Sequence, residues 1–124
     1  MKFLRLMLIV FAIGFSSNSN AVPYTVMGVR SCGNWNEDRA EQSRAEQSNS
    51  RLDVLNSIIV VLPDTAWLMG YLSGIAESEK KNFLENVSGE SLIFWINNYC
   101  QKNPLDKLDD AANVLVKELI KRMH

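Results

Sequence analysis

Hydrophobic residues recur at helical intervals along most of the chain after residue 30. The pattern is clearest in the last segment, where apolar positions alternate three and four residues apart and so share one side of a helix. These positions are Leu105, Leu108, Ala112, Leu115, Leu119 and Met123. Asn103 and Pro104 fit the N-cap and the first position of that helix. The pattern predicts an amphipathic C-terminal helix that a bundle would bury on one side.

Two earlier segments have the same periodicity. One is predicted to run from Ala66 to about Ala76 with Asp64 or Thr65 as its N-cap, and its apolar set is Trp67, Leu68, Tyr71, Leu72 and Ile75. The other follows Ser88 as N-cap, and its apolar set is Leu92, Ile93, Trp95, Ile96, Tyr99 and Cys100. Gly70 and Gly74 each cost about 1 kcal/mol relative to alanine in a helix interior. We therefore expect another helix to approach there, with Trp67, Tyr71 and Trp95 as further packing residues.

The segment from Leu52 to Leu62 is ambiguous. Leu52, Leu55, Ile59 and Leu62 follow helical spacing, but residues 58–61 are β-branched and would also suit a buried strand. The spacing favours a buried helix, which we expect Pro63 to end.

Ser31 is a plausible N-cap for the first helix of the domain, beginning at Cys32. Trp35 and Arg39 lie four residues apart and would share a face of that helix. Trp35 borders a polar stretch, and tryptophan is enriched at binding hot spots. Trp35 and Arg39 are therefore candidate partner contacts, although a core position is the simpler interpretation of Trp35.

The polar stretch contains a tandem repeat. Residues 39–43 read RAEQS, and residues 44–48 repeat them without change. Five residues turn a helix by about 500°, so the second copy is out of register with the first. The repeat has no large apolar residue, and we interpret it as a solvated helix extension or a loop that tolerates insertion.

Residues 1–21 are typical of a cleavable export signal. Lys2 and Arg5 are basic, residues 3–15 form a short apolar run, and Ser19-Asn20-Ala21 resembles a cleavage site. The run is shorter than the about 20 apolar residues of a membrane-spanning helix. We expect a mature chain of residues 22–124, periplasmic or secreted, with no membrane attachment after cleavage.

The 103 residues of the mature chain suffice for one domain with one modest core. Together with the helical periodicity, this predicts an all-α fold, a small single-domain helical bundle. Without Lys2 and Arg5, eleven basic residues stand against fourteen acidic ones, a formal charge of −3. The chain has no cluster of Lys and Arg of the kind that nucleic-acid binding requires, so we expect no nucleic-acid partner.

The two cysteines constrain both structure and chemistry. An even number of cysteines in a small exported domain predicts a disulfide, here Cys32–Cys100. His124 is the only histidine and lies at the terminus, so neither nucleophile–histidine catalysis nor a zinc site with the usual ligands can be assembled. Adjacent carboxylates such as Glu37 and Asp38 diverge on a helix. We expect no catalytic residue, metal or cofactor.

The later half of the chain resembles a known family. Residues 67–75, WLMGYLSGI, resemble the apolar Gly-Tyr-x-x-Gly helix of the resistance-associated immunity proteins, which neutralise periplasm-acting toxins of type VI secretion systems. Residues 95–100 followed by Asn103-Pro104 are similar to the later half of those proteins. A more distant similarity in architecture is to HdeA-type acid-stress chaperones. Both resemblances imply function by protein–protein binding, either as a neutraliser of a toxin or enzyme or, alternatively, as a stress-responsive holdase for unfolded clients.

Overall fold

The computed structural model describes residues 30–123, so the predicted signal segment 1–21 and residues 22–29 lie outside the described residues. Four helices occur in this range: α2 (Cys32–Gln47), α3 (Arg51–Glu79), α4 (Gly89–Lys102) and α5 (Leu108–Arg122). They make up 79% of the described residues, among which there is no strand. The predicted all-α fold is confirmed.

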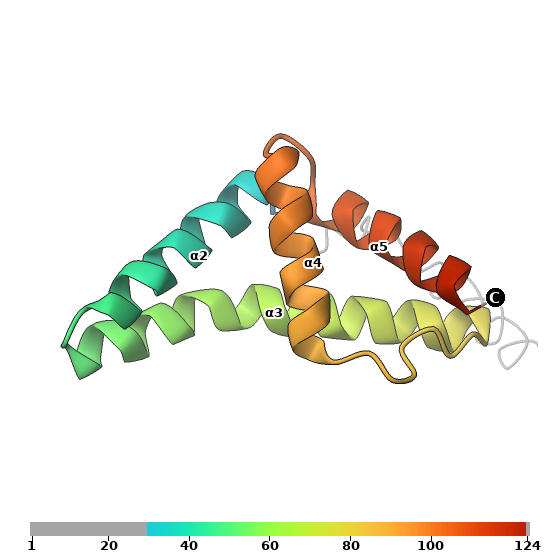
Figure 1. Ribbon diagram of the computed structural model, residues 1–124, viewed down its shortest axis with the longest axis horizontal. Helices are drawn as coiled ribbons and strands as arrows, with labels where there is room; N and C mark the ends of the chain where they lie inside the picture. Colours follow the sequence, from blue (N-terminus) through green and yellow to red (C-terminus); the bar gives the residue numbers. More distant parts are fainter. Residues whose placement is uncertain (1–29, 124) are drawn as a thin grey trace, which may run out of the picture.

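Helices α2 and α3 form an antiparallel hairpin, and α4 and α5 pack on the part of the hairpin away from its tip. Figure 1 shows that the tip, where α2 ends and α3 begins, extends beyond α4 and α5. Helix α2 contacts the other three helices, and α5 contacts both α3 and α4. At the tip, α2 and α3 therefore have only each other as neighbours among the described helices.

Helix α2 begins at Cys32, as the sequence predicts. The Ser31 hydroxyl accepts a hydrogen bond from the Asn34 amide at 3.1 Å, and the Asn34 side chain accepts one from the Ser31 amide at 3.2 Å. Such a reciprocal pair satisfies two of the amides that a helix start leaves without partners. Helix α2 continues to Gln47 and includes most of the tandem repeat, which is thus a helix extension.

Helix α3 is continuous through Pro63, so the predicted end at Pro63 and the predicted caps at Asp64 or Thr65 are wrong. The residues 52–62 are helical, which excludes the strand alternative. Proline removes one backbone hydrogen bond from a helix interior. Here the helix is held on both sides of that position, because Val61, Leu68 and Leu72 are buried. The Thr65 hydroxyl donates to the Val61 carbonyl at 2.9 Å, within the helix that it was predicted to cap.

The start of the last helix is also corrected, because α5 begins at Leu108 and not at Pro104. Asn103 instead ends α4: its backbone amide and its side-chain amide both donate to the Tyr99 carbonyl, at 3.0 and 2.9 Å. The connection then pairs with the chain before α2, where the Cys32 amide donates to Asp106 and the Leu108 amide to Arg30. Because of this pairing, α5 begins only at Leu108. Leu105 therefore lies outside the helix and is 95% exposed.

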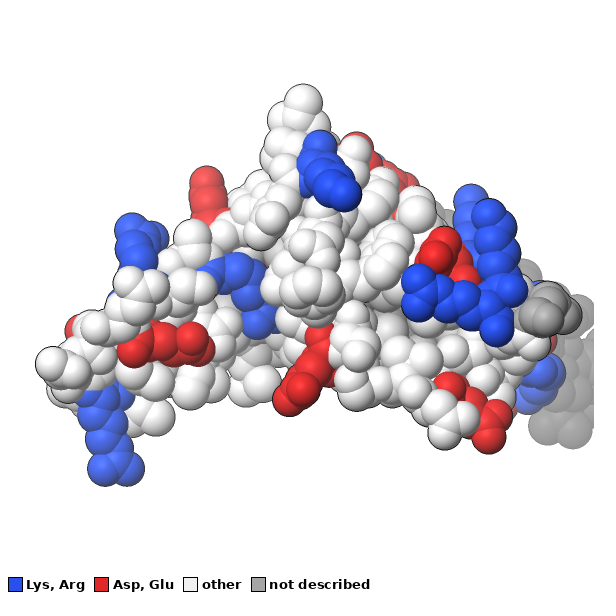
Figure 2. All heavy atoms as spheres, in the orientation of Figure 1, with Lys and Arg blue, Asp and Glu red and all other residues white. Residues whose placement is uncertain are grey.

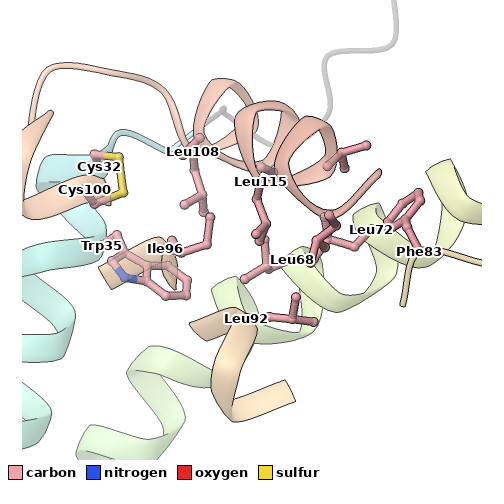
Figure 3. Close-up of a cluster of buried hydrophobic side chains, with 14 residues drawn as sticks. Cys32, Trp35, Leu68, Leu72, Phe83, Leu92, Ile96, Cys100, Leu108 and Leu115 are labelled. Atoms are coloured by element: carbon pink, nitrogen blue, oxygen red, sulfur yellow. A yellow bond between two sulfur atoms is a disulfide. The ribbon is translucent and has the colours of Figure 1, made fainter. Parts of the chain in front are cut away.

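The core lies where the four helices meet (Figure 3). The predicted disulfide between Cys32 and Cys100 is present, with a Cα–Cα distance of 4.7 Å, and both cysteines are fully buried. From α3 and α4 come Leu68, Leu72, Leu92 and Ile96, and α5 contributes Leu108, Ala111, Ala112, Leu115, Val116 and Leu119. The α5 stripe is thus buried from Leu108 to Leu119, whereas Met123 is 49% exposed.

Candidate functional site

The first half of α3 carries a row of exposed aliphatic side chains, which we call the apolar face. It consists of Leu52, Leu55, Ile58, Ile59 and Leu62, whose exposed fractions range from 43% to 72%. Intervals of three, four and three residues place four of them in one row. The sequence predicts a buried helix here, and the structure corrects this because the row faces away from α2.

Helix α2 covers the opposite side of α3. Ser57, Val61 and Asp64 are buried there, about half a helical turn from the apolar face. Apart from Cys32 and Trp35, α2 buries no residue, and its tandem repeat offers no large apolar side chain. Nothing in α2 could cover a second side of α3. Together the five side chains expose about 500 Å², which is within the range of the largest apolar patch on an ordinary monomer, often a functional one.

The same side of α3 continues toward its C-terminal end with small residues. Ala66, Gly70, Ser73 and Gly74 are all exposed. No described heavy atom lies within 4 Å of the position that a Cβ would take at Gly70 or Gly74. The predicted approach of another helix at these glycines is therefore wrong within the described part of the chain. Trp67, Tyr71 and Trp95 are half-buried and do pack against the core.

Trp35 links α2 to α4, and Arg39 links α2 to α3. Trp35 is 1% exposed, and its indole donates to the Asn97 side chain of α4 at 2.6 Å. The Arg39 guanidinium lies 4.4 Å from the Trp35 ring centroid and donates to Thr65 at 2.7 Å. The prediction of a partner contact at Trp35 is wrong, because no surface of the ring is available.

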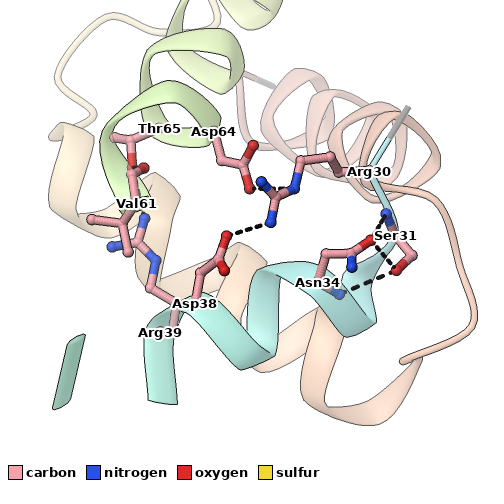
Figure 4. Close-up of polar contacts among 8 residues, drawn as sticks. All are labelled: Arg30, Ser31, Asn34, Asp38, Arg39, Val61, Asp64 and Thr65. Atoms are coloured by element: carbon pink, nitrogen blue, oxygen red, sulfur yellow. Dashed lines mark hydrogen bonds and ion pairs between the residues drawn. The ribbon is translucent and has the colours of Figure 1, made fainter. Parts of the chain in front are cut away.

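A charged cluster lies between α2 and α3 (Figure 4). Arg30 forms ion pairs with Asp38 and with Asp64, the latter at 3.1 Å. Asp64 Oδ2 nonetheless accepts no hydrogen bond among the described residues, because the Nε–H of Arg30 lies close to it but is not directed at it. Burial is the main reason that the pKa of Asp64 is raised, while Arg30 lowers it and Asp38 raises it further. Burial likewise lowers the pKa of Arg39.

A second surface lies between α4, the end of α5 and the connection that precedes α4. One hollow of about 440 Å³ is lined by Asn82, Phe83, Glu85, Asn86, Val87, Ser91, Leu119, Arg122 and Met123. An adjoining hollow of about 430 Å³ is lined by Glu90, Ser91, Phe94, Trp95, Asn98 and Arg122. Ser91 and Arg122 belong to both, so the two hollows form one surface, which we call the α4–α5 groove. Phe94 at its edge is 67% exposed.

No group of three or more His, Cys, Asp or Glu side chains within residues 30–123 is placed to hold a metal ion. Asp64, the one carboxylate in this range with a resolved pKa shift, lies inside the hairpin and ion-pairs with Arg30. The apolar face and the α4–α5 groove each bring several apolar or aromatic side chains together at the surface, so they are the candidate binding sites within residues 30–123.

Comparisons with protein-family models, with curated proteins and with solved structures found no match. Within the described residues, α3 is long and apolar enough to cross a membrane by length and composition alone. Only 22% of its most apolar 18 residues are buried in the protein.

Sequence reasoning missed both surfaces. The apolar periodicity of residues 52–62 was correct, but it does not tell which partner covers the row. The composition of the neighbouring tandem repeat is the signal that could have shown it, since a helix without large apolar residues cannot bury two sides of α3. The groove depends on how α4 crosses α5, and no local pattern indicates that.

Proposed function

We propose that this protein acts without catalysis, by binding a folded protein in an oxidising compartment outside the cytoplasm. The observation that carries the proposal is the α4–α5 groove. Non-obligate interfaces are enriched in aromatic residues, Met and Arg relative to the rest of the surface. The groove combines Phe94, Trp95, Arg122 and Met123, of which Phe94 and Met123 are well exposed.

The charge around the groove indicates what the partner presents. Lys117, Lys121 and Arg122 are all exposed near the end of α5. Figure 2 shows basic side chains, with acidic ones among them, gathered over this end of the molecule. Arg122 already pairs with Glu118 at 3.0 Å, whereas no ion pair involves Lys117 or Lys121 among the described residues. The groove itself is lined by Glu85 and Glu90 as well as by Arg122, so a segment with an apolar side chain flanked by charges of both signs would complement it.

The role that we propose is neutralisation of a periplasmic toxin or enzyme. The resemblance of residues 67–75 and 95–104 to the resistance-associated immunity proteins supports it. The buried disulfide supports an exported protein, because such bonds form and persist in oxidising compartments. In this role the protein forms a stoichiometric complex with one folded partner at neutral pH.

Affinity capture from periplasmic extract tests the proposal. The exported protein should retain one specific partner, and Phe94→Asp should lose it, because a charged carboxylate would replace the exposed aromatic ring at the edge of the groove. Ile59→Asp is the matched control, since Ile59 is also 67% exposed but belongs to the apolar face. Recovery of no partner, or equal loss with both variants, would refute binding through the groove.

The alternative function is a holdase, and the apolar face is the observation that favours it. An exposed aliphatic row of about 500 Å² could hold the apolar segment of an unfolded client. In that case the protein suppresses aggregation of a denatured client, and Ile59→Asp abolishes the suppression while Phe94→Asp keeps it. The raised pKa of Asp64 speaks against an acid trigger in the hairpin, because protonation of this group relieves the fold of a buried charge.

A further inference from the structure

We infer that the apolar face of α3 is covered by α3 of a second copy of this chain, in an antiparallel pair related by a two-fold axis. The inference goes beyond the proposed function, because it concerns a different surface and a different partner. Three properties of α3 carry it: the absence of charge on the exposed side between Asp53 and Glu77, the division of that side into a large and a small half, and its area.

The exposed side of α3 is free of charge over most of its length. Between Asp53 and Glu77 the helix has one ionisable carboxylate or base, Asp64, which is buried on the side of α2. A heterologous partner is usually recognised by polar groups, whereas homodimer interfaces are more apolar than other interfaces. A face of five aliphatic side chains, bordered by charge only at its first turn where Arg51 lies, therefore fits a second copy better than a folded, charged partner.

The two halves of this side complement each other when the helix is reversed. The first half carries Leu52, Leu55, Ile59 and Leu62, and the second carries Ala66, Gly70, Ser73 and Gly74. In an antiparallel pair with its axis at the level of residue 64, Leu55 lies beside Ser73, Ile59 beside Gly70 and Leu62 beside Ala66 of the other copy. Two-fold symmetry forms each of these contacts twice. Three large side chains of each copy thus meet small ones of the other.

This arrangement also accounts for Gly70. Glycine is less favourable than alanine in a helix interior, and nothing in the described part of the chain packs on either Gly70 or Gly74. In the pair, Gly70 would receive Ile59 of the other copy and allow the helices to approach closely. An axis at residue 57, by contrast, would pair Leu55 with Ile59 and Leu52 with Leu62, and would leave both glycines exposed.

The area is consistent with this choice. The large half alone contributes about 500 Å² per copy, so two copies bury about 1,000 Å², at the lower limit for a specific interface. Contact over the small half as well brings the pair above that limit. The longer, large-on-small pairing is therefore the one that the area favours.

Sedimentation of the exported protein, with its disulfide intact, tests the inference. We expect a dimer that dissociates on dilution, and a monomer for Ile59→Asp. Phe94→Asp, with an equal exposed fraction on α4, should remain dimeric. Gly70→Leu should raise the dissociation constant at least tenfold although no described atom obstructs the new side chain in the single chain. A circular dichroism spectrum unchanged from the native protein shows that each variant is folded.

Engineered cysteines test the register. With the axis at residue 64, the two Ala66 positions lie about 6 Å apart along the helices and the two Ile59 positions about 15 Å apart. Ala66→Cys should cross-link the copies on oxidation and Ile59→Cys should not, and the native cysteines are buried and protected from exchange. The opposite result would overturn the large-on-small pairing.

Three outcomes would overturn the inference itself. One is a monomeric native protein at all concentrations, and another is a dimer that persists in Ile59→Asp. The third is a monomer that sediments with phosphatidylcholine or mixed anionic vesicles and loses this property in Ile59→Asp, which would assign the apolar face to a membrane surface. None of these outcomes concerns Phe94, so failure here is distinguishable from failure of the proposed function.

Discussion

Asp64 is a carboxylate inside the α2–α3 hairpin, and its surroundings oppose its charge more than they support it. Only 7% of the residue is exposed, one oxygen lacks a hydrogen bond among the described residues, and Asp38 lies near the same Arg30. Desolvation of a carboxylate disfavours the ionised form, whereas Arg30, which Asp38 shares, and the more weakly acting Arg39 compensate only in part. The pKa of Asp64 is accordingly raised from its ordinary value of 3.8.

This shift predicts how stability changes with pH. The pKa of Asp64 is higher in the folded than in the unfolded state, so burying its charge destabilises the fold. This loss of stability is complete at a pH above the folded-state pKa and disappears at a pH below the unfolded-state pKa. Asp64→Asn should therefore melt at a higher temperature than the native protein at pH 7, and the difference should close as the pH falls toward 3.8. Thermal unfolding across this range measures it, with exposed Glu41→Gln as control. A less stable Asp64→Asn at pH 7 would show that the Arg30 pair outweighs burial.

Trp35 supports a second prediction at the level of one side chain. Its indole is the donor for the Asn97 side chain, and Trp35→Phe would keep most of the ring volume while leaving that acceptor without its partner. The free energy of unfolding in urea should fall by about 1–3 kcal/mol, the usual cost of a buried polar group left unpaired. Trp67→Phe, at a half-buried ring stacked on Tyr71, should cost less. An equal loss in both variants would contradict this role of the hydrogen bond.

Individual helices differ in how well the sequence predicts them. The start of α2 follows from local chemistry, because Ser31 and Asn34 satisfy amides within one turn. The predictions from Pro63 and Asn103 are wrong, because whether either residue ends or starts a helix depends on residues distant in the sequence. The helix through Pro63 is held by buried residues on either side, and Asn103 ends α4 because the next residues pair with Arg30 and Cys32. Such tertiary contacts override local preference, and no short sequence window contains them.

Gly33 in α2 and Gly74 in α3 differ in the space that surrounds them, and this difference predicts unequal results for replacement by alanine. At Gly74 no described atom lies near the position that a Cβ would take, whereas a Cβ at Gly33 in α2 would lie 3.3 Å from both the Pro104 carbonyl oxygen and the Ser31 hydroxyl. In an Ile59→Asp background, which removes the proposed pairing, Gly74→Ala should raise the free energy of unfolding by about 1 kcal/mol. Gly33→Ala should give no such gain. Chemical denaturation of both variants provides the measurement, and equal gains would contradict the close contact at Gly33.

The whole molecule consists of a long hairpin tied to a small core by one covalent link. The disulfide joins the first turn of α2 to the end of α4, and the paired segments around Arg30 and Asp106 lie beside it. The sequence predicts this link and the all-α fold, since cysteine number and periodicity carry that information. The exposure of the apolar face of α3 could not be predicted in the same way, because it depends on which side of α3 is covered by α2.

Removal of the link should therefore release the hairpin from the core. Replacing both cysteines, Cys32→Ser with Cys100→Ser, opens a closed loop of 68 residues and should cost about 2–5 kcal/mol of stability, much of the total for a domain of this size. Both sites are fully buried, so the serine hydroxyls add a penalty, and Cys32→Ala with Cys100→Ala separates the two effects. Urea unfolding of the oxidised, reduced and alanine forms gives the comparison. If the reduced native protein matches the oxidised one in stability, then packing around Trp35 and Ile96 alone holds α2 to α4.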